Sequence, residues 1–407
     1  MGYRQGDRGA RDRRGRRARW PRLSGDQPCL ADPGAHHYRQ THVRRAAATR
    51  PPVTPDDWDR FVANNSLATY LQLSAWARVK APNGWSSAIV SDETGSAPGP
   101  MGAQILFRRP RQVPWTFAYA PRGPIATDWS PSALESWTHR ASSALSAAPG
   151  RVSHLRIDPE IEPDGALDAD RTTQRALSRL GWRRAPAVQP TRTRVIDLSA
   201  PEDALWADLR KKWRQYVNRA RAQGVTVQDV EGDRLEDFHR IMVETASRTG
   251  SHIRALSAYR DVWEAYRPIG MARLLFACDK AGAPQAALFL LRCGTRVVEP
   301  YGGMTGAGAE SRANYLVKWE AIRTSREQGA TSYDMWGLVN PGIAHFKAGF
   351  GGREVRTIGA WDLDLGPVGG RAYRLAERFA AGQRRRQRAS TGEAPGETGP
   401  LGEGGAE

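Results

Sequence analysis

The sequence predicts a mixed α/β protein built from two similar units in tandem. Three observations support this: a β-β-β-α-β pattern occurs twice, the two copies are nearly evenly offset, and apolar residues make up 40% of the 407 residues. Corresponding elements are 187 residues apart at the first strand (85 to 272) and 179 residues apart at the last strand (152 to 331). A helical crossover after a hairpin implies one parallel connection in each sheet.

The first copy lies between residues 85 and 157. Two strands separated by a turn rich in Gly and Pro open the copy, and a third strand follows. A helix then begins at a Ser-Pro pair, which is typical of helix starts, and a last strand completes the unit. The predicted elements are the strands Trp85–Asp92, Met101–Arg109 and Trp115–Tyr119, a helix from Ser130 to Ala148, and the strand Val152–Ile157.

The second copy repeats this order. A glycine-rich segment, Gly302–Ala309, separates its third strand from its helix. We expect this segment to be a loop, because glycine lets the backbone approach a ligand closely. The predicted elements are the strands Ala272–Asp279, Gln285–Cys293 and Arg296–Tyr301, a helix over Ser311–Gln328, and the strand Thr331–Trp336.

The chain is strongly basic, with 60 Lys+Arg against 43 Asp+Glu and a formal net charge of +17. The ends lack apolar periodicity, so we expect them to be disordered tails rather than nucleic-acid-binding arms. Folded structure is expected between them, with the C-terminal part returning to the first unit. The predicted organisation is a basic tail at 1–52, a first unit at 53–192 joined by 359–382, a second unit at 193–358, and a tail at 383–407.

Several classes of protein are disfavoured. No apolar run approaches the ~18 residues that a membrane-spanning helix needs. The N-terminus lacks the apolar region of a secretory signal, so we expect none. The cysteines Cys29, Cys278 and Cys293 are too scattered for a disulfide framework or a zinc site, which predicts a reducing compartment, no metal and no cofactor.

Lysine is rare in this arginine-rich chain, and chance is one explanation for each lysine that remains. Lys347 precedes Gly349–Gly352, so we expect it in a glycine-rich loop, where an ammonium could meet a phosphate or a developing oxyanion. Phe346 beside it could stack on a nucleobase or pack in the core. The six lysines are Lys80, Lys211, Lys212, Lys280, Lys318 and Lys347.

Short motifs in a fixed order carry more information than any one of them alone. They are Leu71-Gln72 with Trp76 and Lys80, Tyr119–Pro124, Leu155–Pro159, Leu209–Arg214, Gly329-Ala330 with Tyr333-Asp334, and Phe346–Gly352. Over about Trp58–Glu377 this series resembles the Fem family of peptidoglycan bridge-forming aminoacyltransferases. The fold of that family, two tandem GNAT-like acyltransferase units, agrees with the repeat described above.

The resemblance implies amide formation without ATP. The acyl donor would be an aminoacyl-tRNA, and the acceptor an amine on the stem peptide of a peptidoglycan precursor, either lipid II or a UDP-linked muropeptide. The short connection from Tyr259 to Arg273 leaves no room for the family's helical arm and resembles compact members, for which glycine or another small residue is expected. We expect a cytoplasmic protein, peripheral at the inner membrane face, with no cofactor and no DNA partner.

The resemblance also assigns roles to individual residues. Lys347 and Phe346 match the family motif that faces the tRNA acceptor end, and we expect them to be catalytic. Lys80 and Arg254 match contacts to the phosphates of the precursor. Tyr259 resembles the family's contact to a substrate hydroxyl. Tyr119 and Tyr301 end the third strand of each unit, where we expect polar rims that face a cleft, and they complete the predicted substrate-binding residues.

A further basic segment lies at Arg210–Arg221, with a charge of +6 and no acidic residue. Leu205, Leu209 and Trp213 begin an apolar stripe at helical spacing, which predicts a helix. Either the charge forms a solvated face, or it follows a tRNA backbone. The predicted tRNA-binding residues are Arg210, Lys211, Lys212, Arg214, Arg219 and Arg221.

Three other functions stay open. The same chemistry could act on a natural-product amine. An acyl-CoA-dependent N-acetyltransferase would keep the fold, but Gly303 stands where that loop usually opens with Arg or Gln. A basic RNA-binding module is the third alternative.

Overall fold

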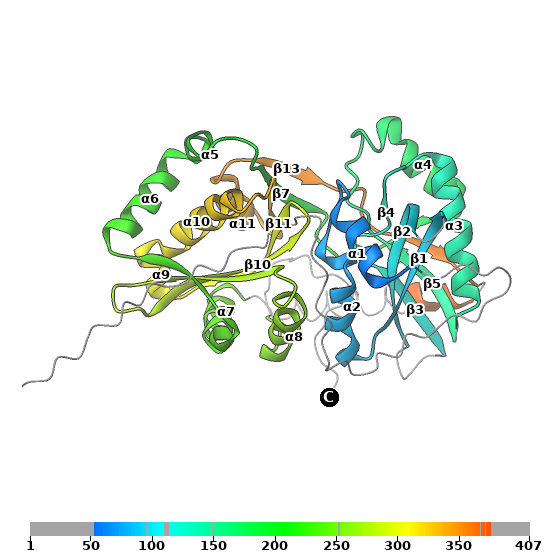
Figure 1. Cartoon of the computed structure of the whole chain (residues 1–407), viewed down its shortest axis with the longest axis horizontal. Coiled ribbons are helices and arrows are strands. Elements are labelled where there is room, and N and C mark those ends of the chain that lie inside the picture. The colour runs from blue at the N-terminus through cyan, green and yellow to red at the C-terminus, as the bar shows by residue number, and fades with distance from the viewer. Residues whose placement is uncertain are drawn as a thin grey trace, which may run out of the picture.

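The computed structural model describes residues 53–94, 97–109, 114–148, 150–250, 253–366, 368–370 and 372–375. The predicted tails at 1–52 and 383–407 lie outside the described residues. The described part of the chain forms two seven-stranded mixed sheets that stand side by side (Figure 1). This confirms the predicted fold class, an α/β chain with two tandem GNAT-like units.

The first sheet holds the first predicted copy. Its strands are β1 (Ser86–Thr94), β2 (Ala97–Arg108), β3 (Trp115–Ala120), β4 (Ile125–Ala126), β5 (Arg151–Ile157), β6 (Arg183–Arg184) and β14 (Trp361–Asp364). Their order is β1-β2-β3-β5-β14-β6, with β4 paired to β2. Among the described strands of this sheet, β3 and β5 form the parallel pair, as a helical crossover requires. The late strand β14 pairs with β5, so the chain returns to the first sheet after completing the second.

The second sheet holds the second copy. Its strands are β7 (Arg192–Asp197), β8 (Thr226–Val230), β9 (Ala272–Cys278), β10 (Pro284–Cys293), β11 (Arg296–Met304), β12 (Ser332–Gly337) and β13 (Arg353–Arg356). Their order is β13-β7-β12-β11-β10-β9-β8. The parallel pair is β11 and β12, which occupy the positions of β3 and β5.

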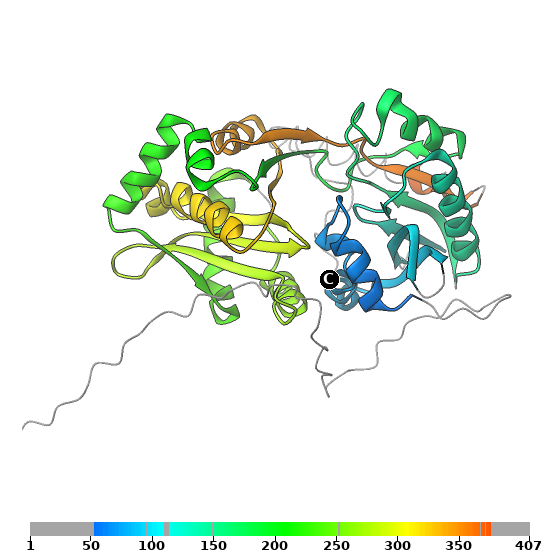
Figure 2. The ribbon, with the colours of Figure 1, turned by 45° about the horizontal axis from the view of Figure 1, so that its top comes forward.

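The helices form three layers around the two sheets. They are α1 (Pro55–Ala63), α2 (Ser74–Lys80), α3 (Pro131–Ser146), α4 (Thr172–Arg179), α5 (Glu202–Asp208), α6 (Lys211–Ala222), α7 (Leu235–Thr249), α8 (Leu256–Tyr266), α9 (Gly306–Ser311), α10 (Ala313–Glu327) and α11 (Pro341–Ala348), with short 3₁₀ helices at η1 (Tyr70–Gln72), η2 (Ala81–Asn83), η3 (Ala169–Arg171) and η4 (Gly232–Arg234). Helices α3 and α4 cover the outer face of the first sheet, and α5, α6 and α10 cover that of the second (Figures 1 and 2). Helices α1 and α2 cover the inner side of the first sheet, α7 and α8 cover that of the second, and α2 packs against α8 (Figure 1).

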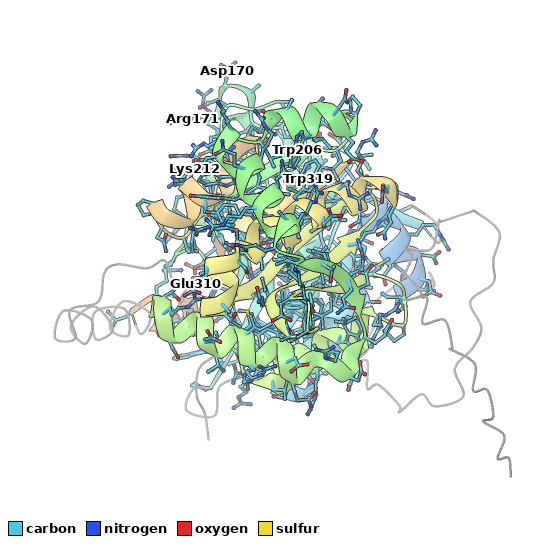
Figure 3. All side chains as sticks on the ribbon, turned by 90° about the vertical axis from the view of Figure 1, so that its left-hand side faces the viewer. Asp170, Arg171, Trp206, Lys212, Glu310 and Trp319 are labelled. Atoms are coloured by element: carbon cyan, nitrogen blue, oxygen red, sulfur yellow. The ribbon has the colours of Figure 1, made fainter. Side chains whose placement is uncertain are left out.

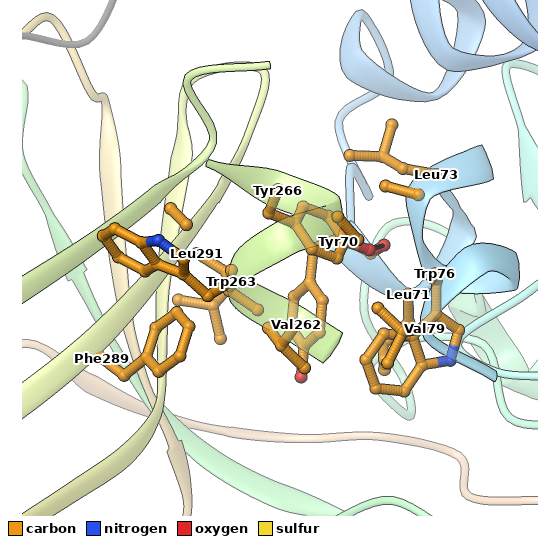
Figure 4. Packing of buried hydrophobic residues seen from close by; sticks show 14 of the residues in the cluster. Tyr70, Leu71, Leu73, Trp76, Val79, Val262, Trp263, Tyr266, Phe289 and Leu291 are labelled. Carbon is orange, nitrogen blue, oxygen red and sulfur yellow. Dashed lines mark hydrogen bonds between the residues drawn. The ribbon is translucent and has the colours of Figure 1, made fainter. Parts of the chain in front are cut away.

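The middle layer is one apolar cluster shared by both units (Figure 4). Tyr70 and Trp76 come from the first unit, and Val262, Trp263 and Tyr266 come from α8 of the second. The hydroxyl of Tyr266 donates to the backbone oxygen of Tyr70 at 2.6 Å. Because each fully buried large apolar side chain contributes about 1.5–3 kcal/mol, this cluster joins the units into one packed body.

The predicted loop at Gly302–Ala309 is wrong. Strand β11 continues through Met304, with Gly303 opposite Ala287 of β10, and α9 begins at Gly306. Glycine is required at position 308, because a Cβ there would lie 2.1 Å from the backbone oxygen of Gln285. The glycines therefore let α9 cross β10 at close range.

The basic segment forms the predicted helix as α6, but the apolar stripe that begins at Leu205 does not continue as one helix. Helices α5 and α6 are separated at Leu209, whose backbone is extended with ψ 136°. Arg214 stabilises the break, because its Nη1 donates to the backbone oxygens of Ala207 and Leu209, both at 2.6 Å. The Arg210 amide donates to the backbone oxygen of Gly349 at 2.9 Å, which ties the start of α6 to the residue after α11.

Lys347 lies in the last turn of helix α11 rather than in the predicted loop. The side chain of Asn340 accepts a hydrogen bond from the Ile343 amide at 2.8 Å, and Pro341 takes the first helical position. Asn at the cap with Pro after it is a recognisable helix start, so this correction was readable in the sequence.

Candidate functional site

Four of the predicted substrate-binding residues meet at the junction between the units. The guanidinium carbon of Arg254 lies 5.6 Å from the ring centroid of Tyr301. The rings of Tyr259 and Tyr301 pack edge to face with centroids 5.2 Å apart. Lys80 ends α2 and is buried, with its Nζ 4.8 Å from the ring centroid of Trp76. The charge of Arg254 lowers the pKa of Lys80, so the two cations lie within electrostatic range of each other.

The cluster is electropositive. Burial, with the charges of Arg254 and Arg108 adding to it, lowers the pKa of Lys80 to about 7. Arg108, at the end of β2, was missed by the sequence analysis, although Arg at a strand end beside the first copy's hairpin was a visible signal. Like charges oppose one another's ionisation, and a bound anion would offset that repulsion. An anion bound here would therefore be stabilised by Lys80, Arg254 and Arg108.

Tyr259 and Tyr70 of the junction stay protonated at neutral pH. Burial, with Tyr301 adding to it, raises the pKa of Tyr259 to about 12. Burial also raises the pKa of Tyr70 well above its ordinary value, and Tyr301 and Arg254 are among the groups that act on it. Tyr70 was not predicted, although it directly precedes the Leu71-Gln72 motif; its ring centroid lies 6.0 Å from that of Trp336. Protonated phenols can donate hydrogen bonds to a substrate.

Tyr119 lies among buried polar groups rather than at an open rim. Its hydroxyl donates to Oδ2 of Asp158 at 2.9 Å, and the Arg122 amide donates to Oδ1 of Asp158 at 2.5 Å. The Arg122 guanidinium pairs with Glu160 at 3.2 Å. Burial raises the pKa of Asp158 to about 6, while the charge of Arg122 opposes that rise. Tyr119 is only 5% exposed. It would therefore influence a substrate through these neighbours rather than by touching it.

The same network crosses to the second unit. Arg296 on β11 pairs with Glu160 from the first unit and with Asp334 on β12. The Arg122 guanidinium carbon lies 5.1 Å from the ring centroid of Trp336, which follows Asp334 closely on β12. A line of buried charges thus runs beside the apolar cluster and fixes the two sheets relative to each other.

Lys347 holds the end of β12. Its Nζ donates to the backbone oxygens of Met335 at 2.6 Å, Trp336 at 3.2 Å and Gly337 at 2.8 Å. Burial, with Lys318 adding to it, lowers the pKa of Lys347 to about 8. Trp336 has a φ of +60°, which is uncommon for a large residue, so these hydrogen bonds stabilise an unusual backbone. Lys347 therefore positions the strand end that presents Trp336 to the junction.

Phe346 lies beside Lys347 and is half-buried. Its ring packs edge to face against Tyr315 and Phe350, with centroids 5.2 Å and 5.3 Å apart. The Nζ of Lys318 lies 5.7 Å from the Phe346 centroid. The Phe346 ring therefore packs against the core and is also partly exposed to solvent.

Some basic residues of the Arg210–Arg221 segment have partners within the protein, and most of the segment's cations are exposed. Arg214 is used at the break between α5 and α6, and Arg221 pairs with Glu320 on α10 at 2.8 Å. The Arg210 Nη1 lies 3.0 Å from Nε2 of His345. Figure 3 looks onto this side of the second unit, where Lys212 is labelled. The exposed members are Arg210, Lys211, Lys212, Arg219 and Arg221.

The start of α9 does not suit a coenzyme A phosphate. The Gly306 amide donates to Oε1 of Glu244 at 2.5 Å, so a carboxylate already occupies the place where the N-acetyltransferase interpretation needs pyrophosphate. Within the described ranges, no group of three or more His, Cys, Asp or Glu is placed to hold a metal. In the same ranges, no helix is long and apolar enough to cross a bilayer.

The sheets and the junction define a two-unit α/β protein whose candidate binding groups gather where the units meet. A model of the FemAB family matches residues 53–278 and 269–378, and the chain belongs to this family. This confirms the resemblance found in the sequence.

Named relatives and a solved structure agree with this assignment. The chain is 27% identical over 231 residues to a lipid II:glycine glycyltransferase of Staphylococcus aureus (strain MRSA252), covering 54% of this chain and 53% of that protein. It is 30% identical over 229 residues to the enzyme of the same name from Staphylococcus saprophyticus, covering 54% of each. The chain thus spans about half the length of these curated relatives. The crystal structure of FemX has the same fold, with a TM-score of 0.72 at 21% identity over 81% of this chain and 99% of that one.

Proposed function

We propose that this protein is a tRNA-dependent aminoacyltransferase of peptidoglycan bridge formation. It would transfer glycine or another small amino acid from an aminoacyl-tRNA to a stem-peptide amine of lipid II or of a UDP-linked muropeptide. The names of the relatives support the reaction class. The observation that carries the proposal is the meeting of Lys80 and Arg254, from different units, beside the buried Tyr259 and Tyr301. Two cations suit the diphosphate that both acceptors contain.

The reaction is aminolysis of an activated ester. The neutral amine attacks the ester carbonyl carbon, a C–N bond forms, the C–O bond to the ribose breaks, and the ribose oxygen receives the proton that the amine loses. Such a reaction needs alignment of the partners and stabilisation of the developing oxyanion. Protonated tyrosines such as Tyr259 supply hydrogen-bond donors, and Lys80 with Arg254 would anchor the acceptor.

Lys347 and Phe346 lie between the junction and the basic face of the second unit. Lys347 contacts the backbone of Trp336, whose ring faces Tyr70, and Phe346 contacts Tyr315 on α10. We place the acyl ester near this pair. A lipid-linked acceptor would be met at the membrane surface through basic residues of the protein.

Single-turnover transfer tests this proposal. Glycyl-tRNA with lipid II, glycyl-tRNA with a UDP-linked muropeptide, and acetyl-CoA with lipid II are each incubated with the protein, and amide products are measured by mass spectrometry. We expect glycyl transfer with at least one precursor and none from acetyl-CoA. Lys80→Ala, which removes a junction cation, should raise the KM for the precursor at an unchanged melting temperature. Efficient acetyl transfer without glycyl transfer would sink the proposal.

A further inference from the structure

Trp336 lies between the two halves of the proposed site. Its backbone oxygen accepts a hydrogen bond from Nζ of Lys347 at 3.2 Å, on the side where the acyl ester is placed. Its ring centroid lies 6.0 Å from that of Tyr70, on the side of the junction. Tyr70 in turn lies within electrostatic range of Arg254 and Tyr301, which are predicted contacts to the acceptor. Trp336 is half-buried, so part of its side chain is not covered by the protein.

The backbone of Trp336 has a conformation that bulky residues rarely adopt. Its φ is +60°, whereas the next residue, Gly337, belongs to the one residue type that tolerates a positive φ freely and does not have one here. Such a conformation costs free energy, persists only where the surroundings enforce it, and is typical of functional sites. The strain therefore falls on a tryptophan although a glycine stands beside it.

Hydrogen bonds within the second unit hold this conformation. The Trp336 amide donates to Oδ1 of Asp334 at 2.7 Å, and Asp334 pairs with Arg296. Besides its contact with Trp336, Lys347 donates to the backbone oxygens of the residues directly before and after it. Because the backbone is held on both sides of the tryptophan, the direction of its side chain is fixed.

The first unit fixes the ring itself. The guanidinium carbon of Arg122 lies 5.1 Å from the Trp336 ring centroid, and Nη2 of Arg122 donates to the backbone oxygen of Pro190 at 2.7 Å. Glycine is needed at position 337, because a Cβ there would lie 2.8 Å from Cγ of Pro190. The indole is therefore a rigid surface held between Arg122 and Tyr70, next to the strand end that Lys347 contacts.

We propose that Trp336 is a specificity-determining residue, whose indole limits the space for the side chain of the transferred amino acid. The inference rests on the proposed function, because it needs an aminoacyl ester that lies near Lys347. A large side chain on the donor would meet the indole before the ester carbonyl carbon reached the acceptor amine. A steric clash of this kind is a general route to specificity, and a ring that cannot move enforces it more strictly than a mobile one.

One tRNA charged with different amino acids tests this role. The same tRNA transcript is charged with glycine, alanine or leucine by an acylating ribozyme, so that the donors differ in the amino-acid side chain alone. Single-turnover transfer to the precursor that the parent uses is measured for each donor. Glycyl transfer by the parent should exceed leucyl transfer at least about 100-fold. The ratio of the two rates is the readout, because a residue that only stabilises the fold would lower both rates together.

Two variants provide a matched pair, because each deletes a half-buried indole. Trp206, on the outer side of the second unit, packs against Trp319 with ring centroids 4.9 Å apart (Figure 3). Trp336→Ala should raise the leucyl-to-glycyl rate ratio about tenfold or more, whereas Trp206→Ala should change it by less than about twofold. Trp336→Phe keeps an aromatic ring at the junction, so it retains the packing and should raise the alanyl-to-glycyl ratio by a smaller factor.

The outcomes are distinct. Unchanged rate ratios in both Trp336 variants, or equal transfer of the three amino acids by the parent, would overturn the proposed role of Trp336. A fall of all rates by the same factor, with a lower melting temperature, would make Trp336 a packing residue and also overturn it. Glycyl transfer by the parent tests the proposed function separately: transfer with unaltered ratios removes only the inference, whereas no transfer from any of the three donors removes the proposed function and the inference with it.

Discussion

The two units share a strand order, yet each uses an arginine differently in the crossover that follows its third strand. Arg122 has a φ of 57° and is 2% exposed, with its backbone and side chain engaged by Asp158 and Glu160. Arg312 has a φ of 65° and is half-buried against Tyr216. The same backbone conformation therefore serves an internal ion network in one copy and an outward surface in the other.

This difference indicates that the two copies of the fold have different roles. The first crossover closes the junction, since its arginine is paired with buried carboxylates and packs on Trp336. The second crossover is short and glycine-rich, and Glu244 caps its helix start. We infer that the first copy holds the units together and the second presents a binding surface.

The largest effect should come from the buried arginine. Arg122→Met removes the buried guanidinium that pairs with Glu160 and whose charge lowers the pKa of Asp158. Arg296 still pairs with Glu160, and the backbone amide of residue 122 still donates to Asp158. We therefore expect a loss of about 3 kcal/mol in the free energy of unfolding, at the lower end for a broken buried ion pair. Arg312→Met should cost less than about 1 kcal/mol, because its site is half-buried and away from carboxylates. Urea denaturation measures both. Similar losses for the two variants would break the comparison.

A smaller effect is expected at Lys347. Lys347→Ala should lower single-turnover transfer about 10²-fold, the scale of losing one contact to developing charge. Lys347→Arg should recover only part of the rate, because a planar guanidinium cannot reproduce three hydrogen bonds to converging backbone oxygens.

A melting-temperature measurement on the same Lys347 variants sharpens this prediction. Loss of rate without loss of stability would place Lys347 at the reacting atoms, whereas parallel losses would make it a positioning residue for the strand end. Full activity of Lys347→Ala would exclude both roles.

The smallest expected effect is a pH dependence of KM that arises from Lys80 in the first unit. Because the pKa of Lys80 is lowered to about 7, its ammonium is charged below pH 7 and is lost as the pH rises through that value. If only the charged form binds the precursor phosphates, KM should rise above pH 7 by up to about tenfold per pH unit. Lys80→Arg stays charged and should flatten the profile. A parent KM that is constant from pH 6 to pH 9 would contradict an anion-binding Lys80.

Much of the fold was readable from pattern alone. The paired β-β-β-α-β units and the strands Met101–Arg109 and Gln285–Cys293 were predicted close to their observed bounds, because apolar periodicity reports which faces are buried. The predictions were wrong at the glycine-rich segment and at the start of the basic helix. Gly302–Met304 extend a strand because they pair with Ala286–Leu288 of β10, and a Cβ at Gly303 would lie 2.6 Å from Oγ1 of Thr245 on α7. Leu209 separates α5 from α6 because Arg214 satisfies the exposed carbonyls.

The candidate site was readable only in part. The motif series indicated Lys80, Arg254, Tyr259 and Tyr301, and the structure brings them together at the junction. Arg108 and Tyr70 were missed although Arg108 ends a predicted strand and Tyr70 directly precedes the Leu71-Gln72 motif. Their relevance arises from neighbours that lie far away in the sequence, which only packing between the units reveals.

By itself the sequence determined the duplicated α/β plan, the family and the motif residues, because these depend on local periodicity and ordered short words. Tertiary structure decided which of those residues are available to contact a ligand. It gave Arg214 backbone partners, paired the exposed Arg221 with Glu320, buried Tyr119 against Asp158, and set Lys347 on three backbone oxygens. The physical reason is that a charged or polar group acts on a ligand only to the extent that its own fold leaves its hydrogen-bonding capacity unused, and that depends on contacts between distant segments.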